Sequence, residues 1–262
     1  MISDLKINEA QKELYYQKGY WTSETLRDAW DAQASAHAQR EYVMDDQGAR
    51  YTYGEIDDKA GRLASWLVAK GVQPGDIVSF QLPTWAEFCI VYVACLKVGA
   101  VMHPLPRNYS DTDLVYVMNK IGTTAFICPT AFHDCHCDEE QAIAVLPQIP
   151  SLKAIALVDK CAPADTELES LSNILASNEP LTDLPPVSSD DVACILTTSG
   201  TTGKPKMALF THNNILFSEK VFTKETLRTA DDVMFMPSPL NHATGFFHGL
   251  ISPMLLGGRA VL

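Results

Sequence analysis

The segment Thr197-Thr198-Ser199-Gly200-Thr201-Thr202-Gly203-Lys204-Pro205-Lys206 places five hydroxyl side chains, two glycines and two lysines within ten residues. A strand-like apolar run, Val192 to Thr197, precedes it, and a second run, Met207 to Phe210, follows it. Glycines let backbone N–H groups approach an anion closely. Hydroxyl and ammonium groups add hydrogen bonds and charge for phosphate oxygens. The segment therefore predicts a phosphate-binding loop between two strands, rather than a Thr/Gly-rich surface linker.

The loop differs from the two familiar nucleotide-binding patterns. A Walker A loop ends in Gly-Lys-Ser/Thr and opens directly into a helix. Here Pro205 follows Lys204 and favours an extended backbone at that lysine. The sequence also lacks a Gly-x-Gly-x-x-Gly dinucleotide fingerprint.

Strand-like and helix-like patterns alternate on both sides of the loop. Buried strands are predicted at Ile77 to Leu82, Thr123 to Cys128, Ala154 to Val158 and Val233 to Met236. Helices are predicted from Ile56 to Leu67, Ala86 to Val98, Ser110 to Ile121, Leu168 to Ala176 and Asn213 to Leu227. This alternation predicts an α/β fold with mostly parallel sheets covered by helices.

Composition excludes several classes of protein. The formal net charge of −12 argues against binding nucleic acid or an anionic membrane through the overall field. The start of the chain does not resemble a signal peptide, and the seven cysteines fit a reducing compartment. The longest apolar run, Phe88 to Leu96, is far shorter than the about 20 residues of a membrane span. We therefore expect a cytoplasmic protein without a transmembrane segment.

Four segments together resemble the adenylate-forming (ANL) superfamily. Thr198 to Lys206, followed by Thr211-His212-Asn213-Asn214, is similar to its phosphate-loop signature, although Met207-Ala208 replaces the usual Gly-Val. The chain resembles three further elements of the family, in the family's order, at Tyr51 to Ile56, Leu96 to Val101 and Pro239 to Gly245. The run His242 to Gly249 looks closest to bacterial short- and medium-chain fatty acyl-CoA synthetases.

The resemblance implies an AMP-forming acid–thiol ligase. It would activate a carboxylic acid, with a fatty acid as the expected substrate, using ATP and Mg²⁺ through an acyl-adenylate, and transfer it to coenzyme A. An aryl-acid or carrier-protein-loading adenylating ligase and a non-catalytic nucleotide- or acyl-binding remnant are the alternatives.

The same resemblance implies roles for individual residues. Phosphate contacts fall on Thr197, Thr198, Ser199, Gly200, Thr201, Thr202, Gly203, Lys204 and Lys206, with the Thr202 hydroxyl nearest Mg²⁺. Catalytic roles fall on His242 and Lys206. The residues implied to line the acyl pocket are His242, Gly245, Phe246 and Phe247, although both phenylalanines could equally be core residues.

Domain organisation follows from the same comparison. Residues 57–230 are predicted to form one α/β subdomain, and residues 1–56 and 231–262 part of a second, incomplete one. The family's downstream Mg²⁺-binding glutamate, ribose-binding aspartate and small C-terminal domain with its lysine do not occur in the sequence. We therefore expect an N-terminal fragment that is inactive alone and self-associates through an apolar face near Ala260 to Leu262.

The remaining polar features receive structural interpretations. His133-Asp134-Cys135-His136-Cys137-Asp138 looks metal-binding, but it has no distant partner pair and is predicted to be an incidental surface loop. Thr211 and His212 are expected to cap and support a helix. His103 and Arg107 could approach a thiol substrate, but are expected in a solvated loop.

Overall fold

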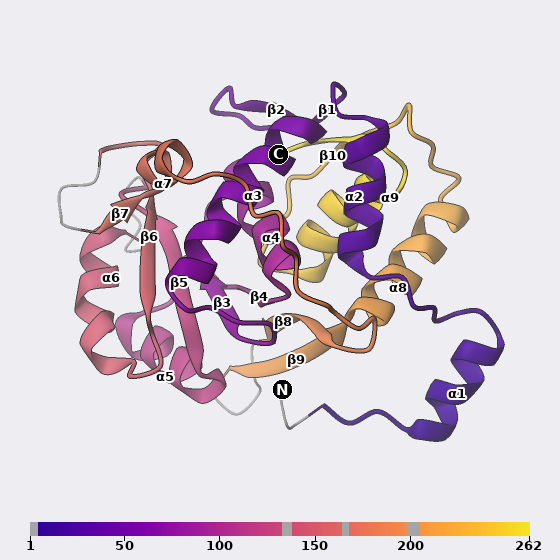
Figure 1. Ribbon diagram of the computed structural model, residues 1–262, viewed down its shortest axis with the longest axis horizontal. Coiled ribbons are helices and arrows are strands. Elements are labelled where there is room, and N and C mark those ends of the chain that lie inside the picture. The colour runs from indigo at the N-terminus through magenta and orange to yellow at the C-terminus, as the bar shows by residue number, and fades with distance from the viewer. Residues whose placement is uncertain (1–4, 133–137, 164–167, 199–204) are drawn as a thin grey trace.

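The computed structural model describes residues 5–132, 138–163, 168–198 and 205–262. The larger sheet within these ranges has the order β7-β6-β5-β3-β4-β8-β9 (Figure 1). Its strands are β3 (Ile77–Phe80), β4 (Val101–Pro104), β5 (Thr123–Pro129), β6 (Ala154–Val158), β7 (Glu169–Ser170), β8 (Val192–Thr198) and β9 (Lys206–Thr211). Every neighbouring pair is parallel except β8 and β9, which are antiparallel. This confirms the predicted α/β class with mostly parallel sheets.

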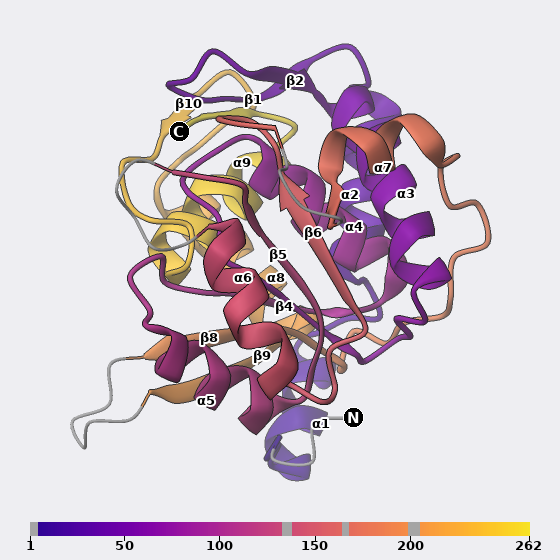
Figure 2. The same ribbon diagram turned by 90° about the vertical axis from the view of Figure 1, so that its left-hand side faces the viewer.

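Helices cover both faces of this sheet. On one side lie α3 (Tyr53–Ala69), α4 (Glu87–Val98) and α7 (Leu171–Ser177); on the other lie α5 (Asp111–Ile121) and α6 (Glu139–Val145), which leads into the short helix η1 (Leu146–Gln148). Figure 2 shows α6 and α7 on opposite sides of β5 and β6. All residues of α4 are buried, as its apolar sequence predicts, because α4 packs between α3 and the sheet.

Local sequence signals explain where these helices begin and end. Thr52 caps α3 with a full capping box to Glu55, and the Ser110 side chain accepts a hydrogen bond from the N–H of Asp113 at the start of α5. Gly99 ends α4 in the left-handed conformation, with φ of 74°. The predicted helices and strands therefore appear within a few residues of their expected bounds.

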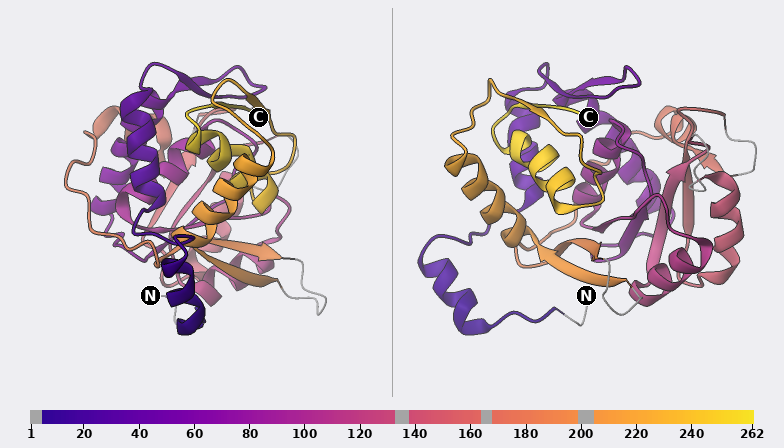
Figure 3. Two further views of the ribbon diagram at one scale, coloured as in Figure 1. Left: turned by 90° about the vertical axis from the view of Figure 1, so that its right-hand side faces the viewer. Right: turned by 180° about the vertical axis from the view of Figure 1, so that it is seen from behind.

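A second sheet joins segments from both ends of the chain. Its described strands run in the order β10-β11-β1-β2, with β10 at Val233–Phe235, β11 at Arg259–Val261, β1 at Glu41–Met44 and β2 at Arg50–Thr52. Against it lie α2 (Leu26–Ala36), the π-helix η2 (Thr244–Ile251) and α9 (Ser252–Leu255). The right-hand view of Figure 3 shows α9 beside α8 (His212–Glu225).

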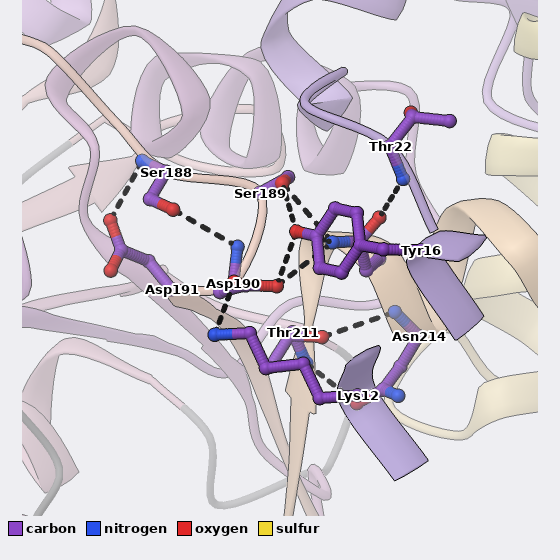
Figure 4. Close-up of polar contacts among 10 residues, drawn as sticks. Lys12, Tyr16, Thr22, Ser188, Ser189, Asp190, Asp191, Thr211 and Asn214 are labelled. Atoms are coloured by element: carbon purple, nitrogen blue, oxygen red, sulfur yellow. Dashed lines mark hydrogen bonds and ion pairs between the residues drawn. The ribbon is translucent and has the colours of Figure 1, made fainter. Parts of the chain in front are cut away.

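The N-terminal helix α1 (Glu9–Gln17) buries no residue, and polar contacts join it to the rest of the chain. The ammonium of Lys12 lies 2.6 Å from a carboxylate oxygen of Asp190, and the Tyr16 hydroxyl donates to the same carboxylate at 2.8 Å (Figure 4). The Asn213 amide donates to the Tyr16 hydroxyl at 3.0 Å. These contacts fix α1 to the start of α8, directly after the strand that follows the predicted phosphate loop.

Candidate nucleotide and acyl site

The predicted phosphate loop connects β8 to β9 along the chain, and these two antiparallel strands form the β8–β9 hairpin. Thr198 pairs with Lys206 and Thr197 with Met207 across the antiparallel ladder, so both ends of the loop are fixed. Thr198 and Lys206 are exposed, whereas Thr197 is buried. Ser199, Gly200, Thr201, Thr202, Gly203 and Lys204, and with them the Mg²⁺ position assigned to Thr202, lie outside the described residues. Contacts of this loop with phosphate stay a prediction.

The residues after the hairpin have the structural roles expected of them. Thr211 caps α8 with a reciprocal capping box to Asn214. His212 is buried, and its Nδ1 accepts a hydrogen bond from the N–H of Leu26 at 3.2 Å. Burial lowers the pKa of His212 to about 4, because the apolar surroundings disfavour its charged form. The hairpin is thereby fixed to the start of α2.

The neutral state of His212 predicts a pH dependence of stability. Its folded-state pKa lies below the unfolded value, so its contribution is complete above about pH 6.5 and is lost as the pH falls towards 4. The shift corresponds to about 3 kcal/mol at the acidic end of this range. The variant His212→Asn retains a hydrogen-bond acceptor but cannot titrate. Urea unfolding at pH 7.5 and pH 4.5 should show a smaller loss of stability for the variant; equal losses would contradict the assignment.

The predicted acyl-pocket residues lie at the start of η2. Gly245 is buried under the preceding turn, where an added Cβ atom would lie 2.0 Å from the carbonyl oxygen of Pro239. Phe246 and Phe247 are 0% and 4% exposed. His242 is exposed just before η2, and its carbonyl accepts a hydrogen bond from the Phe246 N–H at 2.8 Å. The histidine and the two aromatic rings therefore lie on one short segment, with the histidine outermost.

Both phenylalanine rings pack into the core. The Phe246 ring centroid lies 5.1 Å from that of Phe88 and 5.4 Å from that of Tyr92, both on α4. Phe247 lies 5.3 Å from Phe210 on β9, so η2 contacts the strand that follows the phosphate loop. An acyl-pocket role for these rings stays a prediction.

Replacing Gly245 with alanine should destabilise the protein by about 3 kcal/mol, at the upper end of typical overpacking costs. The added methyl group would meet a backbone oxygen, which cannot turn aside as a side chain can. The measurement is the free energy of unfolding in urea. A matched control is Gly258→Ala, whose new Cβ atom would be 3.4 Å from its nearest neighbour. Equal stability of the two variants would show that the turn before η2 can relax.

The position expected for His103 is wrong. It lies on β4 in the middle of the larger sheet and is fully buried, with Nδ1 2.8 Å from the Ser79 hydroxyl on β3. Burial lowers the pKa of His103 to about 3. Its polar character suggested a loop, but the strand formed by the flanking apolar residues continues through this position and pairs it with Ser79. Arg107, by contrast, is partly exposed in the loop after β4.

A groove lies where the carboxyl ends of β3, β4 and β5 approach the second sheet. Its volume is about 390 Å³, and its walls include Trp85, Arg107, Phe132 and Phe235. The Arg107 guanidinium lies 4.8 Å from the Phe132 ring centroid, and Trp85 contacts the same ring edge-on at 5.4 Å. Ligands of open parallel sheets bind at the carboxyl ends of strands. This groove therefore combines a cation with aromatic surfaces at the expected edge.

A buried ionic cluster supports this groove. Lys160 contacts a carboxylate oxygen of Asp45 at 2.5 Å and one of Glu87 at 2.9 Å, and its ammonium lies 5.3 Å from the Trp85 ring centroid. The three charged residues come from the β1–β2 turn, the start of α4 and the loop after β6. The sequence does not reveal this cluster, because no local pattern connects residues so far apart in the chain.

The remaining sequence features concern metal binding and membrane spans. The motif from His133 to Cys137 lies outside the described residues. Elsewhere in the described chain, no three His, Cys, Asp or Glu side chains gather in a way that could hold a metal ion. None of the described helices is long and apolar enough to cross a bilayer.

Comparison with known proteins decides the family. The family model described as AMP-binding enzyme matches residues 30–262. The chain belongs to the AMP-binding enzyme family. The medium-chain fatty-acid–CoA ligase of Escherichia coli K12 is 43% identical over 258 residues, which are 98% of this chain and 45% of that protein. The chain thus spans about half the length of the curated relatives it matches.

Solved structures agree with this membership. The apo structure of Mycobacterium smegmatis MbtA has a TM-score of 0.86 at 25% identity, covering 98% of this chain and 47% of that one. ATP-bound MatB from Rhodopseudomonas palustris has a TM-score of 0.75 at 23% identity, covering 91% and 45%. The adenylate-forming fold inferred from the phosphate-loop motif is therefore confirmed for this member of the AMP-binding family.

Proposed function

We propose that this chain is part of an ATP-dependent fatty acyl-CoA synthetase that acts through an acyl-adenylate. The observation that supports this most strongly is its 43% identity to a medium-chain fatty-acid–CoA ligase across 98% of the chain. The β8–β9 hairpin and η2, which carry the residues of both motifs, are in contact through Phe210 and Phe247. A nucleotide held by the hairpin would therefore lie close to an acid bound beside η2.

In the first half-reaction a fatty carboxylate attacks the α-phosphate of ATP and releases pyrophosphate. Negative charge is redistributed over the phosphates, so fixed donors should supply most of the catalysis. We assign the β- and γ-phosphates to the loop from Thr198 to Lys206. Bound Mg²⁺ would neutralise phosphate charge there, and the Thr202 hydroxyl is the group that would hold it. His242 would lie between the acid and the entering thiol. We place this activity in the cytoplasm.

Carboxylate-dependent ATP–pyrophosphate exchange tests the proposal. It should be measured with the purified chain and, in parallel, with the polypeptide extended by any coding sequence that follows Leu262. We expect exchange with six- to ten-carbon fatty acids by the extended protein and none by the chain alone. Exchange with benzoate only would favour an aryl-acid ligase instead. If calorimetry shows nucleotide binding but no folded sample catalyses pyrophosphate exchange, a non-catalytic role is favoured.

The groove at the carboxyl ends of β3 to β5 supports a site for the thiol substrate. Coenzyme A carries several phosphates and an adenine ring. Arg107 makes no ion pair with any described residue, and it lies on the Phe132 ring beside Trp85. A guanidinium pairs well with phosphate, and aromatic rings stack with a base. We therefore assign the nucleotide end of coenzyme A to this groove.

Replacing Arg107 with methionine should raise the KM for coenzyme A by about tenfold, the loss of one charge-assisted hydrogen bond. Methionine keeps an apolar stem against Phe132 but has no charge. The adenylation half-reaction, followed by pyrophosphate exchange without coenzyme A, should stay within about twofold of the wild type. A lysine at this position should restore part of the affinity. An unchanged KM, or an equal loss in both half-reactions, would place the thiol elsewhere.

A further inference from the structure

A buried carboxylate connects α8 to the helix that carries the proposed acyl pocket. Glu219 on α8 is fully buried. One of its carboxylate oxygens accepts a hydrogen bond from the Ser252 hydroxyl at 2.6 Å and lies 2.8 Å from His248 Nδ1. Its other oxygen accepts from the Ser218 hydroxyl at 3.2 Å. A buried carboxylate requires such donors, so moving η2 away from α8 would leave it unsatisfied.

His248 is held on a second side by an aromatic contact. Its ring stacks on Phe222, with centroids 4.0 Å apart and planes 17° from parallel. Phe222 lies three residues beyond Glu219 on α8, so the two residues share one face of that helix. The guanidinium of Arg228 lies 5.2 Å from the same Phe222 ring. The orientation of His248 is therefore fixed by both its hydrogen bond and its ring contact.

The segment held in this way has an unusual backbone. η2 is a π-helix, and the N–H of Ser252 donates to the carbonyl of Phe247, five residues earlier. π-Helical turns are rare in proteins, and those that occur are often found at functional sites. Glu219 contacts side chains at positions 248 and 252, at the end of this wide turn. It is thus placed to set how η2 lies against α8.

The position of η2 also determines where the two aromatic rings of the proposed acyl pocket lie. Phe246 packs on α4 and Phe247 packs on β9, so a small shift of η2 moves both rings. α8 begins directly after β9, so the same helix also fixes one strand of the phosphate hairpin. α8 is therefore a common support for the hairpin and for the rings of η2.

We propose that Glu219, acting through His248 and Ser252, is a positioning residue that sets which fatty acid chain length is accepted. The inference rests on the proposed function, because it takes Phe246 and Phe247 as the boundary of the acyl pocket. Glu219 itself touches neither substrate. It fixes how far the rings of Phe246 and Phe247 lie from the β8–β9 hairpin, and this distance would set the length of the acyl pocket.

The test is acid selectivity in variants of the extended protein described above. Pyrophosphate exchange is measured with hexanoate, octanoate and decanoate, and the ratios of kcat/KM are compared. These ratios do not depend on how much of a variant is folded. Glu219→Gln and His248→Leu should change at least one ratio by about tenfold, within the range that one or two methylene groups supply in an apolar pocket. The KM for ATP should stay within about twofold.

Two further variants separate positioning from general stability. His248→Asn retains an N–H donor near the place of Nδ1 and should restore the wild-type ratios. Glu169→Gln removes an exposed carboxylate that pairs with Lys70 and should leave them unchanged. A lower thermal midpoint with unchanged ratios in Glu219→Gln would overturn the inference and leave the proposed function intact. No exchange by the wild-type extended protein would overturn both.

Discussion

Replacing Lys206 with methionine is expected to lower kcat/KM for acid-dependent pyrophosphate exchange by about 100- to 1,000-fold, the usual loss when one donor to a developing charge is removed. Lys206 is exposed at the base of the hairpin, opposite Thr198. No carboxylate of the described chain pairs with its ammonium, so this charge is available to a ligand. The backbone of Lys206 is held by its hydrogen bonds to β8, so less conformational entropy is lost when its ammonium binds phosphate.

The control for this experiment is a second exposed lysine. Lys224 lies in the last turn of α8 and has no ion pair with any carboxylate in the described ranges. Lys224→Met should leave exchange within about twofold of the wild type, because general surface charge is screened by salt. Lys206→Arg should recover part of the activity. If Lys206→Met and Lys224→Met behave alike, the phosphates do not lie at the base of this hairpin.

Local sequence signals were sufficient for most of the larger sheet. Ser110 and Gly99 mark helix ends through side-chain capping and a left-handed backbone, and both effects depend on neighbouring residues only. The two strands beside the phosphate loop were expected from their apolar runs, and the register of β8 with β9 confirms them. The division into subdomains at residues 57 and 230 stays a prediction.

Features that depend on distant residues were not predictable from one sequence. β1 and β2 are short and partly polar, and β1 pairs on one edge with β2 and on the other with β11, more than 200 residues away. His103 looks like a loop residue until β4 is placed between β3 and β8. Glu219 and His248 meet only because α8 and η2 pack together. In each case the tertiary neighbour, which the sequence does not reveal, determines the environment.

The Lys160 cluster should show the largest effect on stability. Replacing Lys160 with methionine should lower the free energy of unfolding by about 3–5 kcal/mol, the usual cost of breaking a buried ion pair from one side. The carboxylates of Asp45 and Glu87 have side chains only 0% and 10% exposed, so water cannot replace the lost ammonium. Urea unfolding of wild type and variant measures the difference. The exposed Lys70, paired with Glu169, is the matched control, and Lys70→Met should cost less than about 1 kcal/mol.

The loss of the Lys160 ammonium should cost more free energy at one of the two carboxylates than at the other. Asp45 also accepts hydrogen bonds from the backbone N–H groups of Gln47, Ala49 and Ala86. Within the described part of the chain, the Glu87 carboxylate has one other partner, the Tyr51 hydroxyl at 3.3 Å. Most of the penalty should therefore fall on Glu87. Adding Glu87→Gln to Lys160→Met should recover more than half of the lost stability, because a neutral amide does not need a buried counter-ion. If the double variant is no more stable than Lys160→Met, Asp45 carries the cost, and the backbone donors around it do not stabilise its charge.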